Sequence, residues 1–137
     1  MKRTYVMGVR WIAWLLALSI VALMAAACGL GSERQPVVAV EGGDVARGRE
    51  ALVRYGCTSC HTIPGIRGAT ATVGPPLDDW ADRWYIAGLL VNDPDNLMHF
   101  IQAPQAVLPG GAMVDMGVTT SDARDMAAYL YTLHRDR

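Results

Sequence analysis

A block dominated by hydrophobic residues runs from Trp11 to Ala27, near the start of the chain. Positive charges, the last of them Arg10, lie ahead of this block, and three alanines close it. A charged start, an apolar middle and a small-residue end are typical of a secretory signal peptide. A block of about 17 residues also lies at the lower limit for crossing a bilayer. We therefore predict that residues 1–27 are a signal peptide or a membrane anchor.

The later part of the chain predicts three helices, each starting at a residue whose side chain caps helices well: Asp44, Asp93 and Thr119. The first runs to about Tyr55, the second ends before Pro104, and the third continues to the C-terminus. The following positions recur at helical spacing and predict the buried faces: Val45, Gly48, Leu52 and Tyr55, then Leu97, Phe100 and Ile101, then Ala123, Met126, Ala127, Leu130 and His134.

The segments between and before these helices are irregular. Residues 64–76 are rich in glycine and proline, and residues 77–90 predict one or two short helical turns. Residues 28–43 show no sustained period and predict a flexible tether. No stretch gives a strong strand signal. The expected fold is an all-α domain, residues 44–137, whose long loops need something to wrap.

Charge excludes one class of partner. Loss of residues 1–27 would leave nine arginines, no lysine and thirteen acidic residues, a net charge of −4. Nucleic-acid binding needs a basic patch, which this mildly acidic domain does not offer. We expect no nucleic-acid partner.

Two of the three cysteines belong to one motif, Cys-Thr-Ser-Cys-His at residues 57–61. Two intervening residues let both thiols reach the vinyl groups on one edge of a porphyrin, while the adjacent imidazole lies beneath the iron. This spacing is the standard mark of c-type haem attachment. It predicts one haem c, covalently bound through Cys57 and Cys60, with His61 as an iron ligand.

Two other uses of the motif fit the sequence less well. A thioredoxin-type redox pair would need a βαβ context around Cys57, which is not predicted. A structural zinc site would need four ligands, and after the motif only His99 and His134 remain, without a second closely spaced pair.

A haem that carries electrons needs a second axial ligand, which in cytochromes c is typically methionine. The candidates after the motif are Met98, Met113, Met116 and Met126. Met98 and Met126 lie in predicted helices, where methionine usually fills the core. The loop of residues 108–116 therefore holds the two remaining candidates.

From about Asp44 to Leu133 the chain resembles the class I cytochromes c, the group that includes the mitochondrial carrier. The family pattern Ile/Leu-Pro-Gly-x-x-Met matches residues 108–113, and this resemblance implies that Met113 is the second iron ligand. Val114 replaces the proline that usually follows, so Met116 stays as the alternative. The resemblance also implies the cytochrome c fold, with three main helices and long loops around one covalently attached haem.

Further positions match the family. The family's Gly-Pro-x-Leu is similar to residues 74–77, which implies that the Pro75 carbonyl accepts a hydrogen bond from His61 Nδ1. The resemblance implies that the N- and C-terminal helices cross at Gly48 and Tyr129. Aromatic residues lie where the family often has propionate-binding aromatics, and we interpret them mainly as packing in the haem pocket: Trp80, Trp84 and Tyr85.

The third cysteine, Cys28, follows the apolar block. Residues 23–29, Leu-Met-Ala-Ala-Ala-Cys-Gly, resemble the lipobox of bacterial lipoproteins, although Ala25 stands where leucine is usual. The resemblance implies that Cys28 is lipidated and becomes the new N-terminus, which anchors the domain stably when more than one acyl chain is added. A thiol within a membrane helix is the alternative. We expect an exported protein, periplasmic or on the outer face of the cytoplasmic membrane.

The resemblance predicts an electron-transfer protein rather than an enzyme. It would carry one electron at a time between membrane respiratory or photosynthetic complexes, with a terminal oxidase and a quinol-oxidising complex as partners. A fixed cytochrome c subunit of such an oxidase or quinol-oxidising complex would have the same signature, and a haem peroxidase or gas sensor would need a displaceable ligand. Four arginines close to the motif predict a weak arginine-edged docking face: Arg47, Arg49, Arg54 and Arg67.

Overall fold

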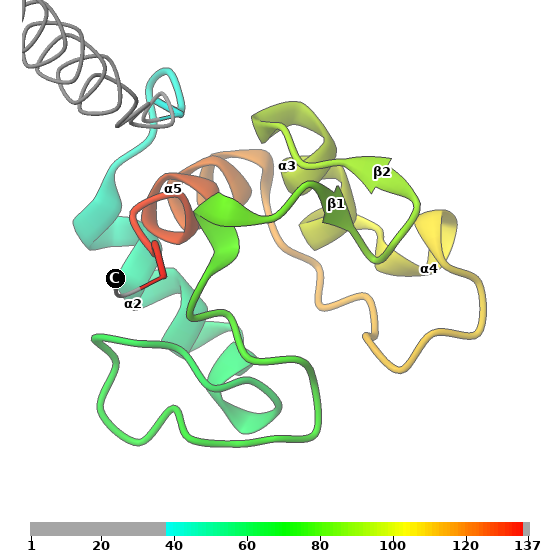
Figure 1. Cartoon of the computed structure of the whole chain (residues 1–137), viewed down its shortest axis with the longest axis horizontal. Coiled ribbons are helices and arrows are strands. Elements are labelled where there is room, and N and C mark those ends of the chain that lie inside the picture. Colours follow the sequence, from blue (N-terminus) through cyan, green and yellow to red (C-terminus); the bar gives the residue numbers. More distant parts are fainter. Residues whose placement is uncertain (1–37, 136–137) are drawn as a thin grey trace, which may run out of the picture. The chain divides into compact units, whose positions relative to one another are not determined.

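A computed structural model describes residues 38–135 of the chain, and its elements are labelled in Figure 1. Helices α2 (Val45–Arg54) and α5 (Thr120–Leu130) pack against each other, and α3 (Pro94–Gln102) packs against α5. Long irregular segments connect them, as the glycine- and proline-rich sequence predicts (Figure 1). The fold is mostly helical.

All three predicted helix starts are confirmed. Asp44 accepts a hydrogen bond from the backbone N–H of Arg47, and Asp93 accepts one from the N–H of Asn96. Thr119 accepts one from the N–H of Asp122. Each bond satisfies one of the amide groups that a first helical turn leaves without a partner.

Helices α2 and α5 approach so closely that their contact leaves no room for a side chain at Gly48. A Cβ atom built there would lie 1.9 Å from the carbonyl oxygen of Asp125. The core continues from this crossing through Leu52, Leu97 and Met126, all almost completely buried. The helix crossing expected at Gly48 is confirmed. Tyr129 lies one turn after Asp125 on α5, is buried, and donates its hydroxyl to the Pro64 carbonyl at 2.5 Å.

The expectation of no strand is wrong for one short hairpin. Strands β1 (Tyr85–Ile86) and β2 (Leu90–Val91) pair antiparallel, with Ile86 opposite Leu90. The backbone N–H of Leu89 donates to the Ile86 carbonyl at 3.0 Å, and the two residues between them, Ala87 and Gly88, both have positive φ. This turn matches the right-handed twist of paired strands. Strands of two residues are too short to show alternation in the sequence.

Two helix boundaries differ from the prediction. Helix α5 ends at Leu130, because the segment after it turns to meet residues 79–82, and the Leu133 carbonyl accepts a hydrogen bond from the N–H of Ala81. Beyond Pro104, where the second helix was expected to end, the chain forms one more turn, α4 (Pro104–Val107). Residues 80–82 form a short 3₁₀ helix, η2 (Trp80–Asp82), as expected for that segment.

The N-terminal predictions lie largely outside the described residues, including the signal peptide or anchor over 1–27 and Cys28. Residues 38–43, which we expected in the tether, pack on the domain, because Val38 and Val40 contact the core. Within residues 38–135, every helix is too short or too polar to cross a membrane.

The buried carboxylate Asp125, in the middle of α5, joins this helix to the start of α2. It accepts hydrogen bonds from Arg47 Nε at 2.7 Å and from the backbone N–H of Asp44 at 2.8 Å. The bond from Arg47 holds the pKa of Asp125 below its ordinary value of 3.8. In the same way, a hydrogen bond from Tyr55 lowers the pKa of Asp122.

These lowered pKa values predict acid destabilisation. At a pH near 3.8 and below, the unfolded chain binds more protons than the folded one, so stability that is fully present at neutral pH falls as the pH drops through the folded pKa. Chemical unfolding measured between pH 7 and pH 2.5 should show this loss. Asp125→Asn should be less stable at pH 7 and lose less on acidification, whereas the exposed Asp78→Asn should follow the parent protein. Equal acid slopes for the parent and Asp125→Asn would contradict this assignment.

Candidate haem site

The Cys-x-x-Cys-His motif lies at the C-terminal end of α2. Gly56, with φ of 76°, turns the chain into the 3₁₀ helix η1 (Cys57–Ser59). The backbone N–H groups of Cys60 and His61 both donate to the Cys57 carbonyl, at 3.2 and 3.0 Å. This tight turn brings the two cysteines and the histidine together in one short loop.

The next loop fixes the orientation of the His61 imidazole. Nδ1 lies 2.7 Å from the carbonyl oxygen of Pro75. A carbonyl only accepts hydrogen bonds, so Nδ1 carries the proton, and in the neutral imidazole Nε2 keeps its lone pair. A histidine ligated through Nε2 is oriented by this kind of Nδ1 hydrogen bond. The sequence resemblance implies the same contact.

Gly74 lets this loop lie directly against the imidazole ring. A Cβ atom at residue 74 would lie 2.4 Å from Cε1 of His61 and 2.8 Å from Nδ1. The Gly74 backbone N–H also donates to the Cys60 carbonyl at 2.7 Å. The loop therefore touches the motif at both the cysteine backbone and the histidine ring.

The two thiols of the motif are free, with Cys57 buried and Cys60 exposed. Burial raises the pKa of the Cys57 thiol. A cysteine that exchanges disulfides needs a lowered pKa, so this environment disfavours thioredoxin-like chemistry. Within residues 38–135, no three or more His, Cys, Asp or Glu side chains are grouped so that they could hold a metal ion.

The four candidate methionines occupy different environments. Met126 is completely buried on α5, and Met98 and Met116 are partly buried and packed against the core. Met113 is also partly buried, but it does not belong to the core cluster of the described residues. Of the two loop candidates, Met116 therefore packs against the core cluster and Met113 does not.

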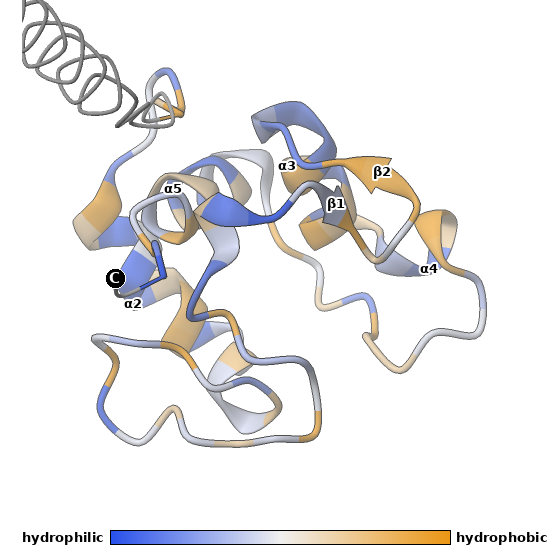
Figure 2. Cartoon of the chain, viewed as in Figure 1, coloured by the Kyte–Doolittle hydropathy of each residue, from blue (hydrophilic) through white to orange (hydrophobic). Residues whose placement is uncertain are grey.

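Several features of the described residues fit a haem next to the motif. The indole nitrogen of Trp80 is the one buried side-chain N or O atom in this part of the chain without a hydrogen-bond partner, so it is free to bind a propionate. The loops and the β1–β2 hairpin also leave large apolar side chains exposed, and apolar surface of this kind can be covered by a bound ligand. These side chains are Val73, Trp84, Tyr85, Leu89, Val91, Leu108 and Val114. Figure 2 shows the hydrophobic colouring of β2, the strand that includes Val91.

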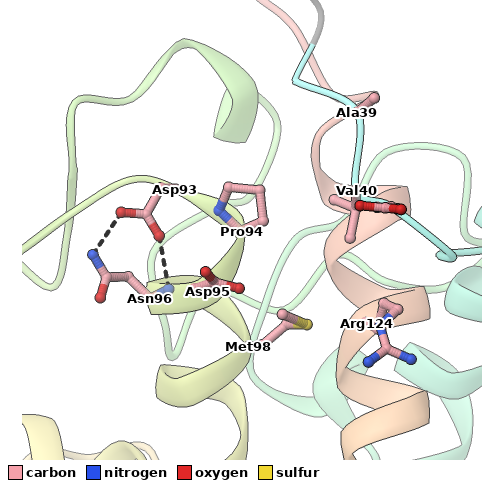
Figure 3. Close-up of a pocket in the computed structure, with 9 residues that line it drawn as sticks. Ala39, Val40, Asp93, Pro94, Asp95, Asn96, Met98 and Arg124 are labelled. Atoms are coloured by element: carbon pink, nitrogen blue, oxygen red, sulfur yellow. Dashed lines mark hydrogen bonds between the residues drawn. The ribbon is translucent and has the colours of Figure 1, made fainter.

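A pocket of 630 Å³ lies elsewhere, between residues 39–41, the first turn of α3 and Arg124 of α5 (Figure 3). Asp93 lines it and is engaged with Asn96 through the helix cap. This pocket includes neither a cysteine nor a histidine. It does not supply the ligands that the motif supplies, so we place the haem site at residues 57–61.

The four arginines near the motif are partly engaged within the domain. Arg47 pairs with Asp125, and Arg54 pairs with Asp122 at 2.7 Å. Arg49 donates to the Gly65 carbonyl at 2.9 Å. These carboxylates offset much of the positive charge that the sequence places around the motif.

Two positions near the site were not given a definite role by the sequence. Arg83 lies over the Trp80 ring, at 5.2 Å from its centre, and donates to Asp79 and to the Pro76 carbonyl. Gln105 on α4 binds the backbone of the loop that carries Met113. Neither residue belongs to a motif that marks such a role. Arg83 contacts the side chains of Asp79 and Trp80 besides the Pro76 carbonyl, and Gln105 acts through backbone groups that are placed by the fold.

Comparison with known proteins places the chain among haem proteins. The cytochrome c family model matches residues 45–134. A cytochrome c2 from Agrobacterium tumefaciens (strain II Chrys) is 33% identical over 104 residues, covering 64% of this chain and 90% of that protein. A solved structure of cytochrome c2 from Rhodobacter sphaeroides has the same fold, with a TM-score of 0.53 at 21% identity over 69% of this chain and 99% of that chain.

A second group of relatives consists of larger proteins. Cytochrome c oxidase subunit 2 from Bacillus sp. (strain PS3) is 33% identical over 93 residues, covering 65% of this chain and 26% of that subunit. The subunit from Bacillus subtilis (strain 168) is 28% identical over 91 residues. The chain thus spans about a quarter of the length of these subunits. Because the family model covers the motif, the Pro75 loop and the Met113 loop together, the chain belongs to the cytochrome c family.

Proposed function

We propose that this chain is a single-haem electron carrier in which Cys57 and Cys60 hold the haem and His61 and Met113 ligate its iron. The observation that carries the proposal is the His61 imidazole, whose Nδ1 binds the Pro75 carbonyl and whose Nε2 is left free. When bound, the haem supplies one-electron exchange between Fe(II) and Fe(III). The protein holds His61 in one tautomer through the Pro75 carbonyl.

Met113 is the proposed second ligand because it lies in the loop but outside the core cluster, whereas Met116 packs against the core. The experiment is the absorption spectrum of the oxidised, haem-loaded protein near neutral pH. We expect the band of methionine-iron ligation in the parent protein and in Met116→Leu, and its loss in Met113→Ala. Absence of the band in the parent protein would instead favour an open iron, as in a haem peroxidase or gas sensor.

We also propose that a terminal oxidase accepts the electron, while a quinol-oxidising complex supplies it. The chain is similar to part of subunit 2 of cytochrome c oxidase from two Bacillus strains, and this similarity supports the oxidase as partner. Since carboxylates offset Arg47 and Arg54, the docking face carries little net positive charge. The rate of electron delivery to the oxidase should therefore fall only weakly with salt, and a steep fall would contradict this. Co-purification after mild detergent extraction would separate a fixed subunit from a free carrier.

The N-terminus supports a proposal about location. The lipobox-like residues before Cys28 favour an exported domain held at the membrane by a lipidated cysteine. Tethering raises the effective concentration of the carrier at its membrane partners. Mass spectrometry of the mature protein should show loss of residues 1–27, an acyl mass on Cys28 and one attached haem. An intact N-terminus would favour the membrane-anchor alternative.

A further inference from the structure

The side-chain amide of Gln105 binds the Met113 loop at three points. Its Nε2 donates to the carbonyls of Gly111 at 2.8 Å and Met113 at 2.5 Å. Its Oε1 accepts a hydrogen bond from the backbone N–H of Gly110 at 3.1 Å. The amide thus uses two donors and one acceptor on residues 110–113.

Gln105 lies on a short helix that is held in place by a buried residue. It belongs to α4, whose first residue, Pro104, is completely buried. The Leu108 backbone N–H donates to the Pro104 carbonyl at 2.8 Å, which closes this turn. Because α4 follows directly after α3, and α3 packs on α5, Gln105 connects the loop to the helical core (Figure 1).

The loop has few other polar connections. Within the described residues, the backbone bond from Gly111 N–H to the Leu108 carbonyl, at 3.0 Å, lies inside the loop and does not tie it to the core. Asp115 reaches the backbone nitrogen of Gln105 only at 3.5 Å, which is marginal for a hydrogen bond. The Gln105 amide therefore provides most of the directional contacts that restrict residues 110–113.

We propose that Gln105 is a positioning residue that holds the backbone of Met113 so that its thioether stays on the haem iron. This inference rests on the proposed function, in which Met113 is the ligand. A loop that is held in place loses less conformational freedom when its ligand binds, so the ligand competes better with other molecules. Without Gln105, Met113 should be displaced more easily.

Imidazole binding to the oxidised, haem-loaded full chain tests this, because imidazole has to displace the methionine. We expect Gln105→Ala to bind imidazole about tenfold more tightly than the parent protein, since the net gain from a few hydrogen bonds is modest. Its reduction potential should also fall, because methionine ligation raises the potential. Gln105→Glu keeps the acceptor for Gly110 and loses both donors, so its imidazole affinity should lie between that of the parent protein and that of Gln105→Ala.

Gln102→Ala is the matched control. Gln102 is also a partly buried glutamine, but it lies on α3, and its amide donates to Thr120 at 3.1 Å rather than to the Met113 loop. Its imidazole affinity should stay within about twofold of the parent value, a change smaller than one net hydrogen bond gives. Hydrogen exchange of the Gly110 amide should accelerate in Gln105→Ala and not in Gln102→Ala.

The outcomes distinguish a failure of the role of Gln105 from a failure of the proposed function. Imidazole affinity and potential that are unchanged in Gln105→Ala, while Met113→Ala loses the methionine-iron band, would overturn the role of Gln105 and leave the proposed function standing. A parent protein without that band, which binds imidazole as tightly as Met113→Ala does, would overturn the ligand assignment and the role of Gln105 with it. Equal effects of Gln105→Ala and Gln102→Ala on imidazole affinity would show that the fold is loosened generally, and would also overturn the role of Gln105.

Discussion

Gly74→Ala is expected to reduce the yield of haem-loaded protein by about tenfold, in line with the loss usually seen when the support of a metal-ligating histidine is removed. The added Cβ would lie 2.4 Å from Cε1 of His61. Real Cβ atoms do not approach so closely, so either the ring or the loop has to move. Either movement lengthens the 2.7 Å hydrogen bond from Nδ1 to the Pro75 carbonyl, which fixes the tautomer.

The measurement is the ratio of haem absorbance to protein in purified samples, together with the spectrum of the fraction that does carry haem. Gly68→Ala is the control, because Gly68 lies in the same region with φ of 80° but has no heavy atom within 4 Å of the added Cβ. Gly68→Ala strains the loop backbone, because residue 68 has a positive φ, but its added Cβ does not touch the imidazole. Full loading of Gly74→Ala with a parent-like spectrum would contradict the close packing of the loop on His61.

Gly48→Ala is expected to lower the free energy of unfolding by about 3 kcal/mol. Overpacking a core usually costs about 1 to 3 kcal/mol, and alanine regains only about 1 kcal/mol of helix propensity over glycine. The value should lie at the upper end, because the added Cβ would meet the Asp125 backbone at 1.9 Å. Backbone atoms cannot rotate away, so α2 and α5 would have to separate. The total free energy of unfolding of a small domain is only about 5 to 15 kcal/mol.

Denaturant unfolding of the haem-loaded protein measures this loss, with Ala46→Gly as control. Ala46 is exposed on the same helix, so its replacement changes helix propensity alone and should cost about 1 kcal/mol. The two substitutions exchange the same residues in opposite directions. If Gly48→Ala proved as stable as the parent protein or more stable, the helices would not be in contact at this position.

The sequence alone determined the features that depend on neighbours along the chain. Asp44, Asp93 and Thr119 each cap a helix through a bond to an N–H three residues later, so the residue and its partner are visible together. The spacing of Cys57, Cys60 and His61 is equally local. The family pattern pointed to the Met113 loop and to Pro75 in the same way, because each is a short motif.

The tertiary structure decided what depends on distant partners. Helical spacing continues to His134, yet α5 ends at Leu130 because the following segment finds hydrogen-bond partners near Trp80. Periodicity records which face of a helix is apolar, not where another segment offers a better bond. The glycine at residue 48 is costly in isolation, and only the crossing of α5 explains it.

The same limit applies to the site. Met113 and Met116 are chemically equal in the sequence, and their packing distinguishes them because, of these two, only Met116 packs against the core cluster of the described residues. Gln105 has no motif that marks it, since its three bonds go to backbone groups of a loop that the fold brings back toward α4. Backbone groups are the same at every residue, so their partners are chosen by the position of the chain in space. The motif therefore determined which cofactor this protein takes, and the folded loops determine how it is held.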